Sequence, residues 1–131
     1  MIGLDTNILV RYFVKDDPDQ TRLAVTLVHG LSAEEPGWVG VGALLELVWV
    51  LTRIYCVQRE QLVQILDTLL ASQDIVVEQR ETVREALRVY RTRNTDFADC
   101  LIASSAKAAG CSRTMTFDHK AARDAGMELL A

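Results

Sequence analysis

The stretch MIGLDTNILVRYFV, residues 1–14, places an acid directly between a short apolar segment and an amphipathic one. The apolar letters of MIGL, residues 1–4, predict a short buried strand, and residues 7–14 predict a helix that follows it at once. Asp5 therefore stands at the carboxyl end of a predicted strand. This arrangement decides how the rest of the chain is interpreted, because apolar strands and helices continue to alternate after it.

The alternation extends over the whole chain. Short strands that are apolar throughout, separated by helices, indicate the α/β class, with a central parallel sheet flanked by helices on both faces. The strands expected from the sequence are residues 1–4, 36–40, 74–78, 113–117 and 127–130. The helices expected from the sequence are residues 7–14, 19–31, 41–56, 60–71, 80–92, 96–109 and 119–125. No linker rich in Gly or Ser interrupts this pattern, so a single domain over residues 1–131 is predicted.

The composition is that of an ordinary globular protein. Of the 131 residues, 50% are hydrophobic and 24% are charged, which argues against disorder. The formal net charge of −4 argues against binding nucleic acid by general charge attraction, but not against a nucleic-acid enzyme with a bound metal ion. No signal peptide or membrane span is visible, and the cysteines, Cys56, Cys100 and Cys111, are interpreted as reduced core residues. A cytoplasmic protein is therefore expected.

Three acids stand where chemistry is expected in such a fold. In open parallel sheets, ligands bind beyond the carboxyl ends of the strands. Asp5 and Asp118 each follow a predicted strand, although each is also suited to cap the helix that comes next. Glu46 is the only charged residue between Val41 and Thr52, so we expect a largely buried carboxylate, which is costly without a partner. We predict that Glu46 belongs to a metal or substrate site; the alternative is a partner elsewhere in the fold.

Two further acids, Asp96 and Asp99, stand at the start of the helix predicted over residues 96–109. At about 100° per residue, Asp96 lies on the same side of this helix as Lys107 and is expected to be an outward-facing cap. Asp99 points roughly 60° away from Asp96, toward the side of Ile102, and is the better candidate for the site. Asp96 is assigned a supporting role.

Asp5, Glu46, Asp99 and Asp118 then form a set of oxygen ligands that contains neither His nor Cys. Such a set suits Mg²⁺ or Mn²⁺ and not zinc. Clustered carboxylates repel one another, and a divalent ion relieves that repulsion. The chemistry expected from these residues is metal-assisted hydrolysis of a phosphodiester bond.

Four segments resemble a PIN domain, specifically the VapC ribonuclease toxins: IGLDTNILVRYF (2–13), LLELVWVLTR (44–53), DFADCLIA (96–103) and TMTFDHKAA (114–122). The resemblance implies a Rossmann-like sheet and an endoribonuclease that depends on Mg²⁺, with Mn²⁺ as a substitute. It also implies a type II toxin that acts on RNA, forms a homodimer and binds a cognate antitoxin whose tail blocks the acidic pocket. In the family's terms the four acids match the acidic quartet, with Asp5 and Asp99 as the principal metal ligands. Asn7 and Thr116 match polar positions that line the pocket.

The sequence departs from the family's pattern at two positions. Gly42 stands where such proteins often carry Ser or Thr, and His119 stands where Arg, Lys or an acid is more usual. Neither change removes a carboxylate, yet a catalytically inactive PIN-like module that binds a protein partner or RNA without cleavage stays an alternative. A phosphatase with an aspartyl nucleophile is a third interpretation. Asn7 opposes it, because such an enzyme usually has a second aspartate there.

The segment RETVREALRVYRTR, residues 80–93, contains five arginines against two glutamates. Arg84, Arg88 and Arg91 share one helical face and are candidates for contacting RNA phosphates. The alternative is a solvated face with Glu–Arg pairs, each of which contributes little to stability.

Other features are assigned to structure. Metal-free cleavage needs two poised imidazoles, and His29 is interpreted as a surface or core-edge residue. Trp38, Trp49 and the leucines of residues 60–71 are interpreted as mostly core.

Overall fold

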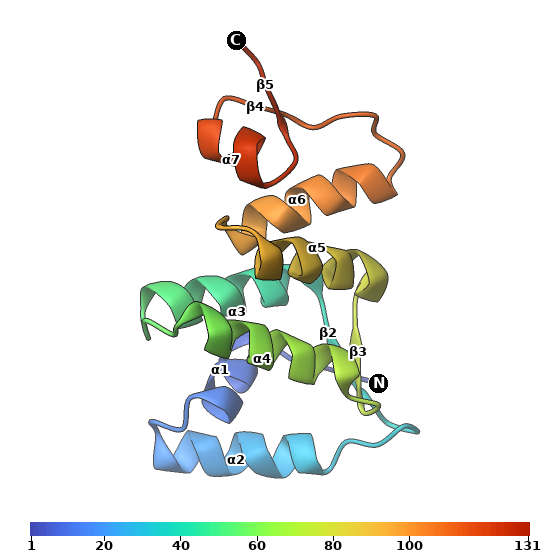
Figure 1. The fold of residues 1–131 in the computed structure, drawn as a ribbon. Coiled ribbons are helices and arrows are strands. Elements are labelled where there is room, and N and C mark those ends of the chain that lie inside the picture. Colours follow the sequence, from blue (N-terminus) through green and yellow to red (C-terminus); the bar gives the residue numbers. More distant parts are fainter. The chain divides into compact units, whose positions relative to one another are not determined.

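The computed structural model describes all of residues 1–131 and contains seven helices that alternate with five short strands (Figure 1). The α/β class predicted from the sequence is confirmed, and every strand pair is parallel. The chain consists of two compact units, Met1–Glu78 and Gln79–Ala131.

The sheet of the first unit has three strands in the order β1-β2-β3. Its strands are β1 (Ile2–Gly3), β2 (Gly37–Val39) and β3 (Ile75–Val77). In β2, Gly37 and Val39 are buried whereas Trp38 between them is exposed, because successive side chains in a strand point to opposite faces. Since all three strands are parallel, their carboxyl ends meet at one edge, and Asp5 follows β1 at that edge.

Four helices complete the first unit: α1 (Thr6–Phe13), α2 (Pro18–His29), α3 (Val41–Arg53) and α4 (Arg59–Ala71). Helix α1 packs against both α2 and α3, and α4 packs against α3 and β3. The predicted leucines of α4 are buried, as expected from apolar residues repeated on one helical face: Leu62, Leu66, Leu69 and Leu70.

The second unit begins with two helices that pack along each other, α5 (Arg80–Thr92) and α6 (Phe97–Ala108). Tyr90 of α5 meets Phe97 of α6 edge to face, with 5.7 Å between the ring centroids. The remaining elements are β4 (Met115–Thr116), α7 (His119–Asp124) and β5 (Glu128–Leu129), and α7 packs against both strands. The strands β4 and β5 pair with each other, so the predicted strands form a three-stranded and a two-stranded parallel sheet.

The burial of four residues differs from expectation. Trp38 is 36% exposed and Trp49 is 56% exposed, so the prediction that both are core residues is wrong. Cys100 is buried as predicted, but Cys56 and Cys111 are exposed, and all three are free thiols. None of the helices combines the length and the apolar character that crossing a membrane requires.

The core of α4 gives a direct test of the fold. Leu62→Ala is expected to lower the free energy of unfolding by about 2–5 kcal/mol, because Leu62 is fully buried and its truncation leaves a cavity. Leu23→Ala is the matched control, since Leu23 is 66% exposed. Urea denaturation of both variants measures the difference, and equal effects of the two substitutions would contradict the packing described for α4.

Candidate active site

Asp5 begins α1 directly after the first strand. Its carboxylate Oδ1 accepts a hydrogen bond of 2.7 Å from the backbone N–H of Thr6, and its carbonyl accepts from Ile8 and Leu9. These bonds satisfy backbone donors that a helix N-terminus leaves without an intrahelical partner. The side chain is nevertheless exposed, so the cap role and a role in binding are compatible.

Glu46 lies on the exposed face of α3, and the prediction that it is buried is wrong. Gly42, Trp49 and Arg53 are exposed on the same helix, whereas Leu44, Leu47, Val48 and Leu51 form its buried face. The sequence did not indicate this exposed face, because two of its residues, Gly42 and Trp49, are uncharged and so fit an apolar pattern. Glu46 therefore has no need of a compensating partner for burial, and its candidacy depends on its surroundings.

Those surroundings are a pocket of about 200 Å³ in the first unit. Asp5, Asn7 and Glu46 all line this pocket. Arg11 and Tyr55 line it as well, and apolar side chains of α1 and α3 complete its wall. The first unit thus combines two carboxylates, an amide and a guanidinium in one hollow at the carboxyl end of β1.

The start of α3 has an acid that sequence reasoning missed. Gly40 is the N-cap of α3 and has no side chain to offer, and the Glu78 carboxylate accepts a hydrogen bond of 2.8 Å from the backbone N–H of Val41 instead. Glu78 follows β3 as Asp5 follows β1, so the same positional signal was present. Its cap fixes the beginning of the helix that carries Glu46.

In the second unit, Asp96 is the cap that the sequence predicted for α6. Its Oδ1 accepts a hydrogen bond of 2.8 Å from the backbone N–H of Ala98. Asp99 lies one turn further on and is half-buried. Burial raises the pKa of the Asp99 carboxyl above its usual value, and the nearby charges of Asp96 and Asp118 raise it further, while Lys120 opposes the shift.

Asp118 begins α7 after β4. Its Oδ1 accepts hydrogen bonds of 2.8 Å and 3.2 Å from the backbone N–H groups of Lys120 and Ala121. The hydroxyl of Thr116 accepts a bond of 3.0 Å from the backbone N–H of Asp118 and so fixes the turn between β4 and α7. The second unit thus brings Asp96, Asp99 and Asp118 close enough for their charges to interact.

The acids of each unit fit a hard divalent cation in their chemistry. Carboxylate oxygens are the ligands that Mg²⁺ and Mn²⁺ prefer, and burial together with the charges of Asp96 and Asp118 raises the pKa of Asp99. However, no group of three or more Asp, Glu, His or Cys residues is arranged to hold a metal ion.

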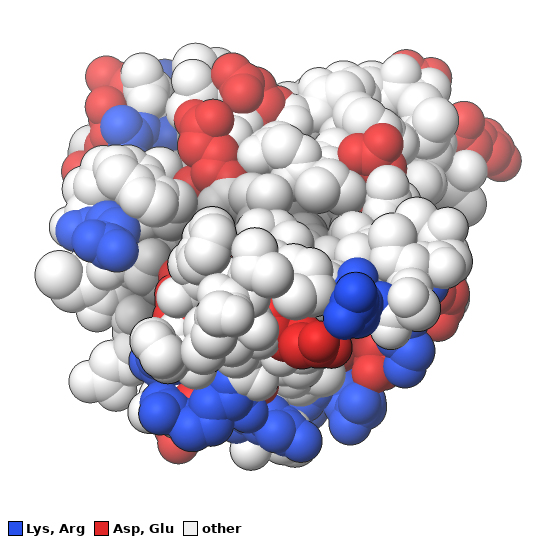
Figure 2. Space-filling model, turned by 90° about the horizontal axis from the view of Figure 1, so that it is seen from above, with Lys and Arg blue, Asp and Glu red and all other residues white.

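The arginines of α5 are partly neutralised by neighbouring acids. Arg88 makes two hydrogen bonds to Glu85, of 2.9 Å and 2.6 Å, and Arg84 lies 3.8 Å from Glu81. Figure 2 shows that acidic side chains lie among the basic ones on the face in view. These pairs match the solvated face that was the alternative prediction, although Arg84, Arg88 and Arg91 are all exposed.

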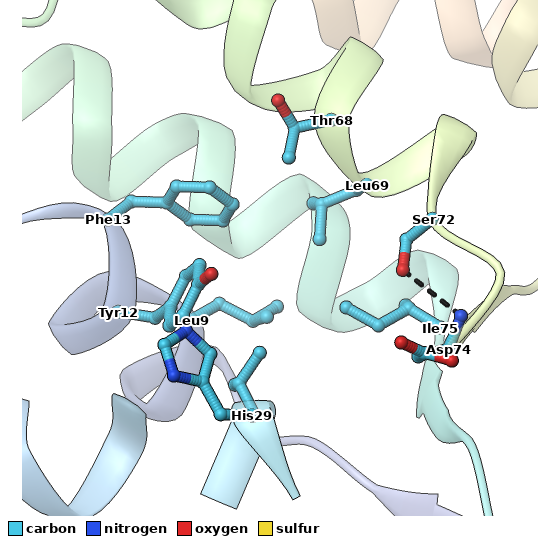
Figure 3. Close-up of a pocket in the computed structure, with 10 residues that line it drawn as sticks. Leu9, Tyr12, Phe13, His29, Thr68, Leu69, Ser72, Asp74 and Ile75 are labelled. Carbon is cyan, nitrogen blue, oxygen red and sulfur yellow. Dashed lines mark hydrogen bonds between the residues drawn. The ribbon is translucent and has the colours of Figure 1, made fainter. Parts of the chain in front are cut away.

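A second pocket of the first unit lies at the other edge of the sheet. It has a volume of about 260 Å³ and includes Asp74 and Ile75, where β3 begins (Figure 3). His29 is exposed there and meets the ring of Tyr12 edge to face at 6.2 Å, as expected of a residue at the edge of the core. Because ligands of parallel sheets bind beyond the carboxyl ends of strands, this pocket is not the candidate active site.

Comparison with known proteins identifies a family and a relative that this chain matches. A sequence model described as "PIN domain" matches residues 2–126 and so spans both units. The chain is also similar to a protein named VapC ribonuclease from Aquifex aeolicus (strain VF5), with 28% identity over 118 residues. That match covers 89% of this chain and 87% of the relative.

The burial of Asp99, together with the charges of Asp96 and Asp118, predicts an unusual effect on stability. The fold raises the pKa of Asp99, so its charged form opposes folding above the usual pKa of an aspartate. Asp99→Asn is therefore expected to raise the melting temperature near neutral pH in metal-free buffer. The gain disappears as the pH falls below the usual aspartate pKa, where the carboxyl is neutral in both the folded and unfolded states.

Thermal melts across pH measure this effect. Asp19→Asn is the control, because Asp19 is an exposed acid near the start of a helix, α2. The carboxylate of Asp19 lies 3.7 Å from the guanidinium of Arg22. Equal melting temperatures of Asp99→Asn and the parent protein at every pH would contradict a raised pKa of Asp99 in the folded protein.

Proposed function

This chain belongs to the PIN-domain family, and we propose that it is a divalent-metal-dependent endoribonuclease that hydrolyses RNA phosphodiester bonds. The observation that carries the proposal is the pocket in which Asp5, Asn7 and Glu46 meet at the carboxyl end of β1. The similarity to a protein named VapC ribonuclease supports RNA as the substrate.

The proposed site consists of Asp5, Glu46, Asp99 and Asp118. The family match extends over residues 2–126 and so includes all four. We therefore propose that residues 1–131 form a single domain in which these four carboxylates bind Mg²⁺, or Mn²⁺ in its place.

We assign each residue a role from its match to the pattern of the PIN-domain family. Asp5 and Asp99 are the principal ligands, Glu46 and Asp118 complete the acidic set, and the caps that Asp5 and Asp118 provide limit the movement of their carboxylates. Asn7 supplies a polar group at the pocket of the first unit, Thr116 fixes the turn before Asp118, and Asp96 orients the helix that carries Asp99. When bound, the metal ion supplies Lewis-acid catalysis of the hydrolysis.

The biological role proposed for this enzyme is that of the toxin in a type II toxin–antitoxin pair, acting in the cytoplasm as a homodimer. It rests on the similarity to VapC ribonuclease. The exposed apolar side chains of Trp49 and Ile54, 56% and 60% exposed, support contact with another protein chain at the end of α3. The cognate antitoxin or the second copy of this chain is the proposed partner.

The catalytic proposal predicts RNA cleavage in the presence of Mg²⁺ or Mn²⁺ and none after EDTA treatment. Asp5→Asn and Asp99→Asn are each expected to lower the rate more than about 100-fold, because even groups that only support metal ligands contribute 10–100-fold. Asp19→Asn is expected to keep full activity. Gel-based cleavage assays measure these rates, and cleavage that persists in EDTA or in both site variants would rule out the mechanism.

The inactive binding module is the competing interpretation, and metal binding distinguishes it. A bound metal ion raises the free energy of unfolding of a protein that has such an active site. The increase is about 2.7 kcal/mol when the ion concentration is 100 times the dissociation constant. A module without a metal site gains nothing from added Mg²⁺. Burial and the neighbouring acids disfavour the ionised form of Asp99, and a bound cation would offset both effects, which favours the enzyme.

A separate prediction concerns α5. If its arginines contact RNA, replacing Arg84, Arg88 and Arg91 together with Gln is expected to lower the salt-dependence slope of RNA binding by about 2, because each phosphate neutralised on a single strand contributes about 0.7. Arg113→Gln is the control, because Arg113 pairs at 3.0 Å with Glu128 on another part of the second unit. An unchanged slope in the triple variant would leave α5 as a solvated face paired by Glu81 and Glu85.

A further inference from the structure

Arg11 is the cation of the acidic pocket, and its guanidinium is held by three neighbouring side chains. Its Nη1 donates to Asp16 Oδ1 at 2.9 Å and to the Tyr55 hydroxyl at 3.1 Å, and its Nε donates to Gln20 Oε1 at 2.7 Å. A guanidinium has five N–H donors, and none of these three bonds uses the two on Nη2. The arginine is therefore fixed in place with one nitrogen still available to a ligand.

The three contacts form a closed arrangement. The hydroxyl of Tyr55 accepts from Arg11 and donates to Asp16 Oδ2 at 3.0 Å, so Asp16 is bonded by both residues. The partners come from the turn after α1, from α2 and from the segment after α3. A side chain bonded from three segments has few rotamers left, and this preorganisation lowers the entropic cost of binding a ligand.

The location of Arg11 indicates what the ligand is. Arg11 and Tyr55 line the same pocket as Asp5, Asn7 and Glu46, and the Arg11 side chain is 27% exposed. A guanidinium matches the geometry of a phosphate group, and an RNA strand carries a phosphate at every nucleotide. The volume of about 200 Å³ is below the range usual for drug-sized ligands.

We propose that Arg11 binds a backbone phosphate of the RNA next to the cleaved bond, and that Asp16 and Tyr55 are positioning residues that orient it. This inference rests on the proposed ribonuclease function and adds a substrate-binding residue to it. The competing explanation is that Arg11 only ties α1 to its neighbours. The two explanations differ in their effects on RNA, because a purely structural tie changes the stability of the fold and not the salt dependence of binding.

The first experiment measures binding of a short single-stranded RNA of mixed sequence over a range of salt concentrations. All variants carry Asp99→Asn so that the RNA stays intact. Adding Arg11→Gln is expected to weaken binding about tenfold, as for loss of a charge-assisted hydrogen bond, and to lower the salt-dependence slope by about 0.7. Arg22→Gln is the matched control, since Arg22 is an exposed arginine of the same unit outside this pocket, and it is expected to leave the slope unchanged.

Two more conservative variants separate the effect of the positive charge of Arg11 from the effect of its orientation. Arg11→Lys keeps the charge but not the fork of donors, so it is expected to keep the slope while binding more weakly. Tyr55→Phe removes one hydroxyl from the arrangement and is expected to raise KM for RNA cleavage about threefold without changing kcat, as for weakened ground-state binding. This variant is made in the active protein, and melting temperatures of all variants report separately on any structural effect.

The outcomes separate a failure of the Arg11 proposal from a failure of the proposed ribonuclease function. If the parent protein does not cleave RNA with Mg²⁺ or Mn²⁺, the proposed function fails whatever Arg11 does. If the parent cleaves RNA but Arg11→Gln keeps the parental slope and affinity, the phosphate contact is overturned and Arg11 is a structural tie. If Arg11→Gln lowers the slope but Tyr55→Phe leaves KM unchanged, the contact stands and the positioning role of Tyr55 is overturned.

Discussion

The N-terminus of a helix needs hydrogen-bond acceptors, and the arrangement of the whole site depends on how this chain supplies them. Asp5, Asp96 and Asp118 each accept backbone N–H groups at the start of α1, α6 and α7. Glu78 does the same for α3 from the end of β3. Capping therefore fixes carboxylates at the starts of the helices that carry the candidate site, so local folding and site assembly use the same side chains.

The arrangement carries a cost in stability that a metal ion would offset. Burial and the acids around it raise the pKa of Asp99, so its ionised form is disfavoured in the folded chain. A divalent cation stabilises that ionised form and the neighbouring carboxylates together. The protein without metal is thus expected to be less stable than its core of Leu, Val and Ile side chains alone would make it.

The sequence predicted features that depend on local pattern, and it failed where distant segments decide the outcome. The caps at Asp5, Asp96 and Asp118 and the bounds of α5 follow from spacing alone. Glu46 was predicted to be buried because its neighbours are apolar, but Trp49 on the same face is exposed. The role of Arg11 could not be predicted from the sequence. It depends on hydrogen bonds to Asp16, Gln20 and Tyr55, and no periodic pattern in the sequence connects these positions.

A double-mutant cycle on metal affinity tests the shared site most directly. Mn²⁺ binding is measured by electron paramagnetic resonance in the parent protein, in Asp5→Asn, in Asp99→Asn and in the variant with both changes. If Asp5 and Asp99 hold the same ion, each single change weakens binding strongly and the second change adds little. Losses that simply add, or undiminished binding in either single variant, would contradict a metal ion shared by these two carboxylates.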